Sequence, residues 1–209
     1  MFVFPLNASP HLNQLPPTKH SLPNAVAMPL PHLTPLPARH PASCASLSLS
    51  LLSMLDRVLP APPSLTLSIG SGPGLLEALF LDAYPARATI GPVISFYGVE
   101  VASSTTVNRF LPEQNALEVA GTWAVAREVE EARGLMFVYP RQKGLIQTYL
   151  HKGTGVNVVV WIGPRCDVEE MIEPLGSWGV EDKDIYGEGL VEDGEAILVF
   201  RKRSGGIQA

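Results

Sequence analysis

The sequence has few of the residues that characterise disulfide-stapled or membrane-spanning proteins. Cys44 and Cys166 are the only cysteines among its 209 residues. Two cysteines form neither a disulfide framework nor a zinc cluster, so we expect reduced thiols, no metal and a cytoplasmic protein. No uninterrupted apolar run reaches the length of a transmembrane helix, which predicts no membrane partner.

Acidic residues are missing from the first 55 positions, where Lys19 and Arg39 are the only charged side chains apart from the histidines. The rest of the chain carries 13 basic and 20 acidic residues. This balance lacks the concentrated basic stripe of a nucleic-acid surface, so we expect a small-molecule partner and no nucleic acid. The acid-free, serine-containing start is also compatible with organelle import, although it contains a single arginine.

Proline divides the chain into two parts. Ten of the 20 prolines lie within residues 1–42, where they remove backbone donors and interrupt regular structure. We therefore predict a disordered, proline-rich leader at 1–42 that is dispensable for folding, followed by one α/β domain at 43–209.

Apolar periodicity from residue 65 onward predicts strands that alternate with helices. The expected strands are 65–69, 93–99, 116–120, 135–139 and 156–162, and the expected helices are 43–59, 75–84, 123–133, 142–150 and 167–178. Residues 46–51 also alternate like a strand, and Asp167 with Glu170 resembles a capping box. The last strands, 185–186 and 196–200, have only a glycine turn between them and must be antiparallel. The pattern predicts a three-layer α/β fold with a mostly parallel sheet.

The turn Gly70-Ser-Gly-Pro-Gly74 connects the first expected strand to its helix. Glycine lets the backbone turn sharply and approach a ligand, and the helix start offers free N–H groups. The spacing is G-x-G-x-G, unlike the G-x-G-x-x-G that is usual for dinucleotide sites. A turn that only connects two elements is the alternative interpretation.

This turn and the strand order over residues 60–203 resemble motif I and the plan of class I S-adenosylmethionine-dependent methyltransferases. The resemblance implies a Rossmann-like sheet, a methyl acceptor and the cofactor S-adenosyl-L-methionine. It places cofactor contacts at the carboxyl ends of three strands: Ser68, Gly70, Ser71, Gly72, Gly74, Glu100, Val101, Gly121 and Thr122. Glu100 is the expected acceptor for the ribose hydroxyls, with a solvated strand-end acid as the alternative.

One position departs from the family pattern. Many members carry Asp or Glu two residues before the first motif glycine to hold the methionine ammonium group, whereas this chain has Ser68. Backbone carbonyls or Glu77 are the possible replacements. The acid expected beside the adenine is also missing, and Trp123 offers either an aromatic wall or a core side chain.

The substrate side follows the fourth strand, where the resemblance implies that Tyr139 lines the pocket and Arg141 holds a carboxylate or phosphate. Arg141 as a solvated helix-start residue is equally compatible with the sequence. His151 is the only histidine outside the leader, and we expect it at the opposite sheet edge, away from the chemistry. No catalytic residue is predicted.

The sequence thus favours a methyltransferase that acts on a small molecule. A methyltransferase-like binding protein without catalysis remains open because of Ser68. A nicotinamide-dependent oxidoreductase is the third hypothesis, and the glycine spacing and the terminal strand pair count against it. The oligomeric state is left open.

Overall fold

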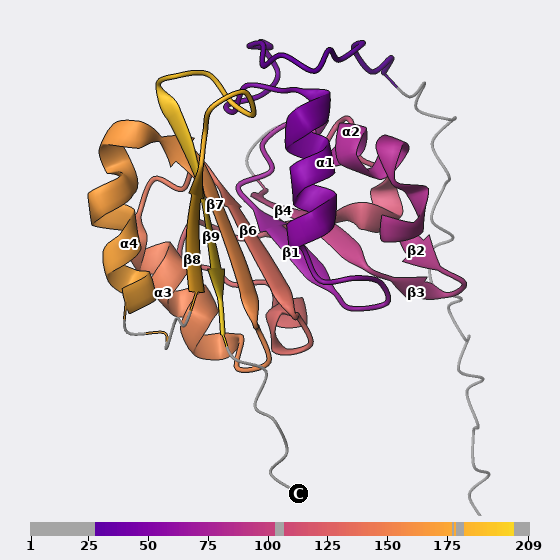
Figure 1. Cartoon of the computed structure of the whole chain (residues 1–209). Coiled ribbons are helices and arrows are strands. Elements are labelled where there is room, and N and C mark those ends of the chain that lie inside the picture. Colours follow the sequence, from indigo (N-terminus) through magenta and orange to yellow (C-terminus); the bar gives the residue numbers. More distant parts are fainter. Residues whose placement is uncertain (1–27, 103–106, 177, 179–181, 203–209) are drawn as a thin grey trace, which may run out of the picture.

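The computed structural model describes residues 28–102, 107–176, 178 and 182–202 and centres on one seven-stranded sheet (Figure 1). The strands lie in the order β5-β4-β1-β6-β7-β9-β8. Their bounds are β1 Thr66–Ile69, β4 Phe96–Val101, β5 Ala116–Val119, β6 Gly134–Val138, β7 Val158–Pro164, β8 Asp182–Tyr186 and β9 Glu195–Arg201.

Of the seven strands in the sheet, β9 alone runs against the others. The five strands β5, β4, β1, β6 and β7 are parallel, whereas β9 runs antiparallel to both β7 and β8. The predicted mostly parallel sheet with an antiparallel C-terminal pair is therefore confirmed. Parallel neighbours need crossovers, and the strand order changes direction between β1 and β6, which is where open α/β sheets form ligand sites.

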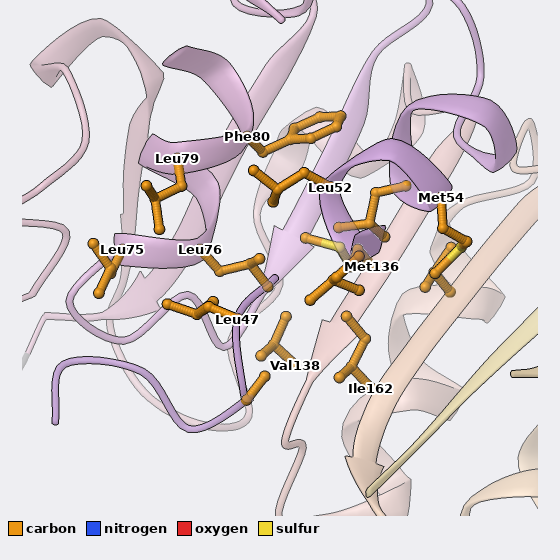
Figure 2. Packing of buried hydrophobic residues seen from close by; sticks show 14 of the residues in the cluster. Leu47, Leu52, Met54, Leu75, Leu76, Leu79, Phe80, Met136, Val138 and Ile162 are labelled. Atoms are coloured by element: carbon orange, nitrogen blue, oxygen red, sulfur yellow. The ribbon is translucent and has the colours of Figure 1, made fainter. Parts of the chain in front are cut away.

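Helices cover both faces of the sheet and make three layers (Figure 1). Helices α1 (Leu49–Val58) and α2 (Leu75–Ala83) pack on one face with Met136, Val138 and Ile162, as Figure 2 shows. Helices α3 (Lys143–Lys152) and α4 (Val168–Gly176) pack on the other face. Because alternate strand residues point to opposite faces, Leu135, Phe137 and Trp161 belong to this second core.

The strand-like alternation of residues 46–51 has a mixed outcome. Leu47 forms an isolated antiparallel bridge with Ala38, and helix α1 begins only at Leu49. Ser48 caps that helix by accepting a hydrogen bond from the N–H of Leu51 at 2.9 Å. The predicted helix before the sheet is confirmed with a later start.

The predicted amphipathic helix at 123–133 is wrong. This stretch contains only the 3₁₀ helix η3 (Arg127–Glu130), and Trp123 is 78% exposed. Alanine, arginine and glutamate favour a helix here, so tertiary packing overrides the local propensity: Val129 and Ala132 are buried, and the N–H of Ala126 donates to the hydroxyl of Tyr149 at 3.2 Å.

Three further boundaries differ from the predictions. The 93–99 strand divides into β3 (Val93–Ile94), which pairs with β2 (Thr89–Ile90) in a small hairpin, and the longer β4. Asp167 ends the 3₁₀ helix η4 (Arg165–Asp167), and α4 begins after it at Val168, so Asp167 is not an isolated cap before the helix. Glu113–Asn115 forms the short 3₁₀ helix η2 directly before β5, outside the predicted helices.

The part of the predicted leader that the structure describes, residues 28–42, touches the domain. Ala42 is 6% exposed, and Leu30 and Leu33 pack against the core that contains α1 and α2. The packed chain therefore begins before residue 43, and residues 1–27 of the leader lie outside the described residues. None of the helices in the described part is both long enough and apolar enough to cross a membrane.

Candidate functional site

A cavity of about 590 Å³ lies at the carboxyl ends of β1, β4, β5 and β6. Its volume falls in the range of pockets that bind drug-sized ligands. The residues that line it are Cys44, Ile69, Gly70, Gly72, Val99, Glu100, Val101, Val119, Gly121, Thr122, Ala124, Val138, Tyr139, Pro140, Arg141, Gln142, Leu145 and Tyr149. The lining is mostly apolar, with a few polar groups that come from different strand ends.

The glycine turn is held in a conformation that only glycine adopts easily. Gly70 has φ +85°, and a Cβ there would lie 2.7 Å from the carbonyl oxygen of Val138, so β6 excludes any side chain at this point. Gly72 has φ +55°, and a Cβ there would meet no atom within 4 Å. Since Gly72 also lines the cavity, its backbone faces the cavity without a side chain in between.

Glu100 joins the glycine turn to the end of β4. One carboxylate oxygen accepts from the N–H of Gly72 at 2.7 Å, and the other accepts from the N–H of Val101 at 2.8 Å. Each carboxylate oxygen has a second lone pair, so Glu100 retains acceptor capacity toward the cavity that it lines.

Ser68 and Glu77 form a buried pair beneath the turn. The Ser68 hydroxyl donates to Oε1 of Glu77 at 2.6 Å, and the two residues are 0% and 1% exposed. Among the described residues, Oε2 of Glu77 has no hydrogen-bond partner. Burial raises the pKa of Glu77 to about 7, against the lowering effect of the Ser68 hydroxyl, and the charge of Glu100 raises it further.

A small recess of about 20 Å³ adjoins this pair. Glu77 lines it together with the backbone of the glycine turn and residues 42–44. The recess and the larger cavity share Cys44, Gly70, Gly72 and Val138, so the two spaces meet at the glycine turn. A space of this size holds a single water-sized or ammonium-sized group.

The end of β5 contributes Gly121 and Thr122 to the cavity. A Cβ at Gly121 would lie 2.5 Å from the ring of Trp123, so the indole lies directly over this glycine. Trp123 is neither a core side chain nor among the residues that line the cavity.

Tyr139 occupies a strained position at the end of β6. Its φ of +49° lies in the left-handed region, which is unusual for a bulky residue and is typical of functional sites. Its hydroxyl donates to Oε1 of the buried Glu195 at the start of β9. Burial and this carboxylate raise the pKa of Tyr139 well above its ordinary value, so the phenol stays protonated.

Eight of the eleven predicted site residues line the larger cavity: Gly70, Gly72, Glu100, Val101, Gly121, Thr122, Tyr139 and Arg141. Ser68, Ser71 and Gly74 do not. Ser68 is turned to Glu77, and the Ser71 hydroxyl bonds to the side-chain oxygen of Asn108 at 2.6 Å. Gly74 is the N-cap residue that precedes helix α2, with φ +79°.

Arg141 is exposed and precedes helix α3, which begins at Lys143. It is therefore both a cavity residue and a residue next to a helix start. His151 is exposed in the last turn of α3 and does not line the cavity, as expected.

Sequence reasoning missed two residues that shape the site, Cys44 and Glu195. Cys44 lies 26 positions before Gly70, the first residue of the glycine turn, and lines both spaces. Glu195 contacts Tyr139 across 56 positions of the chain. Neither belongs to a motif, and only the fold brings them to the strand ends.

Comparison with known proteins identifies the fold. A predicted O-methyltransferase from Agrobacterium tumefaciens aligns with a TM-score of 0.51 at 16% identity, over 74% of this chain and 80% of that one. The methyltransferase domain of bacterial CtHen1 aligns with a TM-score of 0.50 at 14% identity, over 73% of this chain and 95% of that one. No protein-family model matches the chain, and no curated protein is similar to it in sequence.

At these identities the likeness extends to the fold alone. The chain has the mostly parallel, Rossmann-like sheet with an antiparallel strand pair that is found in methyltransferases of class I.

Proposed function

We propose that this protein binds S-adenosyl-L-methionine in the 590 Å³ cavity and transfers its methyl group to a small molecule. The observation that carries the proposal is the meeting of Glu100 with the glycine turn at the mouth of one cavity. The Glu100 carboxylate can accept hydrogen bonds from the ribose, and the adjacent backbone of the glycine turn leaves room for the amino-acid part of this cofactor.

In this proposal, different residues contact different parts of the cofactor. Glu100 accepts hydrogen bonds from the ribose hydroxyls with its remaining lone pairs. Gly121 and Thr122 flank the adenine with little steric bulk, and Val119 and Leu145 supply apolar contact. The glycine turn faces the methionine part.

Glu77 takes the place of the missing acid at Ser68. Glu77 lines the recess, which meets the larger cavity at the glycine turn, and its Oε2 has no hydrogen-bond partner among the described residues. A buried carboxylate is stabilised in its charged form by a cation. In this proposal the ammonium group of the cofactor is that cation, so binding shifts the protonation equilibrium of Glu77 toward its charged form at neutral pH.

Methyl transfer needs position more than covalent help. When bound, the cofactor would supply an electrophilic methyl group and a neutral thioether as the leaving group, and a deprotonated acceptor would need no base. Holding the acceptor atom in line with the carbon–sulfur bond supplies much of the rate. Tyr139 is a protonated phenol already bonded to Glu195, so it acts as a wall and not as a base, while Arg141 faces a carboxylate or phosphate of the acceptor.

The test is ligand-dependent thermal stability. A ligand at 100 times its Kd stabilises the native state by about 2.7 kcal/mol, which is roughly 5–10 °C in a domain of this size. S-adenosylhomocysteine should produce such a shift and NADH and NADPH should not. A shift with the nicotinamides alone would instead support an oxidoreductase.

A binding protein without catalysis is the second candidate, and Ser68 is the observation that favours it. Incubation with methyl-labelled cofactor and a panel of small carboxylates, phosphates and phenols separates the two. Binding of S-adenosylhomocysteine together with no labelled product across the panel would favour the binding protein.

A further inference from the structure

The residues that precede the sheet contribute to the cavity. The backbones of Ala38 and Leu47 exchange hydrogen bonds of 3.0 and 2.9 Å, which closes residues 38–47 into a loop, here called the wall loop. At one end Leu47 is buried in the core beside α2 and β6 (Figure 2). At the tip, residues 42–44 line the recess at the glycine turn, and Cys44 also lines the larger cavity.

One buried carboxylate fastens this loop. Glu195 is 0% exposed and accepts from the backbone N–H of Ser46 at 3.2 Å and from the Ser46 hydroxyl. The same carboxylate accepts from the hydroxyl of Tyr139, and a guanidinium nitrogen of Arg39 lies 3.6 Å away. A buried charge needs partners, and three of its four donor groups lie on the wall loop.

We propose that the wall loop forms one side of the ligand site, against the amino-acid end of the cofactor, and that Glu195 positions it there together with Tyr139. This inference rests on the proposed function. Ala42, Ser43 and Cys44 of the loop line the recess at the glycine turn. In this arrangement the loop shields that end of the ligand from water. Glu195 touches no ligand in this arrangement and acts through Ser46 and Tyr139.

The two cysteines provide a matched experiment. Both are exposed, and Cys166 lies in η4 outside the residues that line the cavity. The full chain is alkylated with iodoacetamide, with and without S-adenosylhomocysteine, and each cysteine is followed by mass spectrometry. We expect the ligand to slow labelling of Cys44 at least tenfold and to leave Cys166 unchanged.

Glu195→Gln tests the fastening without ligand. The amide nitrogen would face donors that need an acceptor, so the loop should loosen and Cys44 should react several-fold faster at an unchanged Cys166 rate. Glu188→Gln is the control, because Glu188 is an exposed acid in the same connection between β8 and β9 and, within the described residues, makes no hydrogen bond or ion pair with the wall loop. Ser46→Ala is the second variant should Glu195→Gln not fold, and it should give a smaller acceleration in the same direction.

The outcomes separate the inference from the proposed function. If S-adenosylhomocysteine raises the melting temperature but labelling of Cys44 does not slow, the wall loop is not part of the site, while cofactor binding stands. If the ligand causes no thermal shift, both fail. If Glu195→Gln and Ser46→Ala fold and label Cys44 at the parent rate, Glu195 does not hold the loop.

Discussion

The two sides of the cavity differ in how far apart in the sequence their contacting residues lie. On the glycine side, the turn at residues 70–74 follows β1 directly, and Glu100 reaches Gly72 from the adjacent strand β4. On the wall side, Ser46 meets Glu195 across 149 positions of the chain, and Tyr139 meets it across 56. The glycine side is largely a local structure, and the wall side exists only when the whole sheet has formed.

This difference has a physical consequence. A turn set by three positive-φ glycines depends on backbone conformation that the sequence specifies locally. A buried carboxylate whose donors come from two distant segments, the wall loop and the end of β6, depends on both of them, and its network loosens as a unit. We therefore expect substitutions on the glycine side to change ligand affinity. Substitutions on the wall side should change how easily the wall loop opens and how stable the fold is.

The largest effect is expected for Gly72→Val. A side chain at φ +55° is strained by roughly 1–2 kcal/mol, and it occupies the cavity that Gly72 lines. Isothermal titration should detect no binding of S-adenosylhomocysteine. Gly189→Val is the matched control, since Gly189 has φ +73°, open space around it and no place in the cavity lining. It should lose similar stability and bind normally, and equal binding by both variants would reduce the turn to a connector.

Glu100→Ala should weaken S-adenosylhomocysteine by roughly 10- to 200-fold. The loss corresponds to charge-assisted hydrogen bonds of about 1.5–3 kcal/mol. Glu118→Ala provides the comparison, because Glu118 is the register partner of Glu100 on β5 and lies outside the cavity lining. Titration calorimetry of the two folded variants decides the matter, and similar affinities would remove Glu100 from the site.

The same division explains what the sequence could predict. Strand order, the antiparallel pair and the glycine turn follow from periodicity and from turn residues that act locally. The amphipathic pattern and helix-forming residues of 123–133 predict a helix, but the packing of Val129 and Ala132, which the local sequence does not reveal, leaves one 3₁₀ turn. The roles of Cys44 and Glu195 had no local signal, since each is an ordinary residue until Ser46 and Tyr139 are brought beside it.

Glu77→Gln tests the acid that lies between the two sides. The folded pKa of about 7 exceeds the ordinary 4.5. The free energy of unfolding of the parent therefore falls as pH rises from about 4.5 to 7, and it falls no further on this account above pH 7. The amide does not titrate and causes no such fall. At pH 8 the variant should unfold with a free energy higher by on the order of 3 kcal/mol, and at pH 4 the two proteins should be alike.

Urea unfolding at both pH values provides the measurement for Glu77→Gln. Glu170→Gln, an exposed acid on α4, should change little at either pH. The Glu77 variant should also bind S-adenosylhomocysteine more weakly than the parent despite its higher stability. Equal stability at pH 8, or unchanged affinity, would contradict the role of Glu77 as the buried anion.

The smallest effect is expected for Tyr139→Phe, which keeps the ring in the cavity and removes only the bond to Glu195. The free energy of unfolding should fall by about 1 kcal/mol, or roughly 2–4 °C in melting temperature, with little change in S-adenosylhomocysteine affinity. Tyr186→Phe is the matched control, because its hydroxyl also bonds a carboxylate, that of Asp184 at 3.1 Å, but on β8 away from the wall loop. Iodoacetamide labelling of Cys44 should accelerate in Tyr139→Phe and not in Tyr186→Phe. If both variants label Cys44 alike, Tyr139 belongs with the glycine side as a cavity wall only, and Glu195 holds the loop through Ser46 and Arg39 without it.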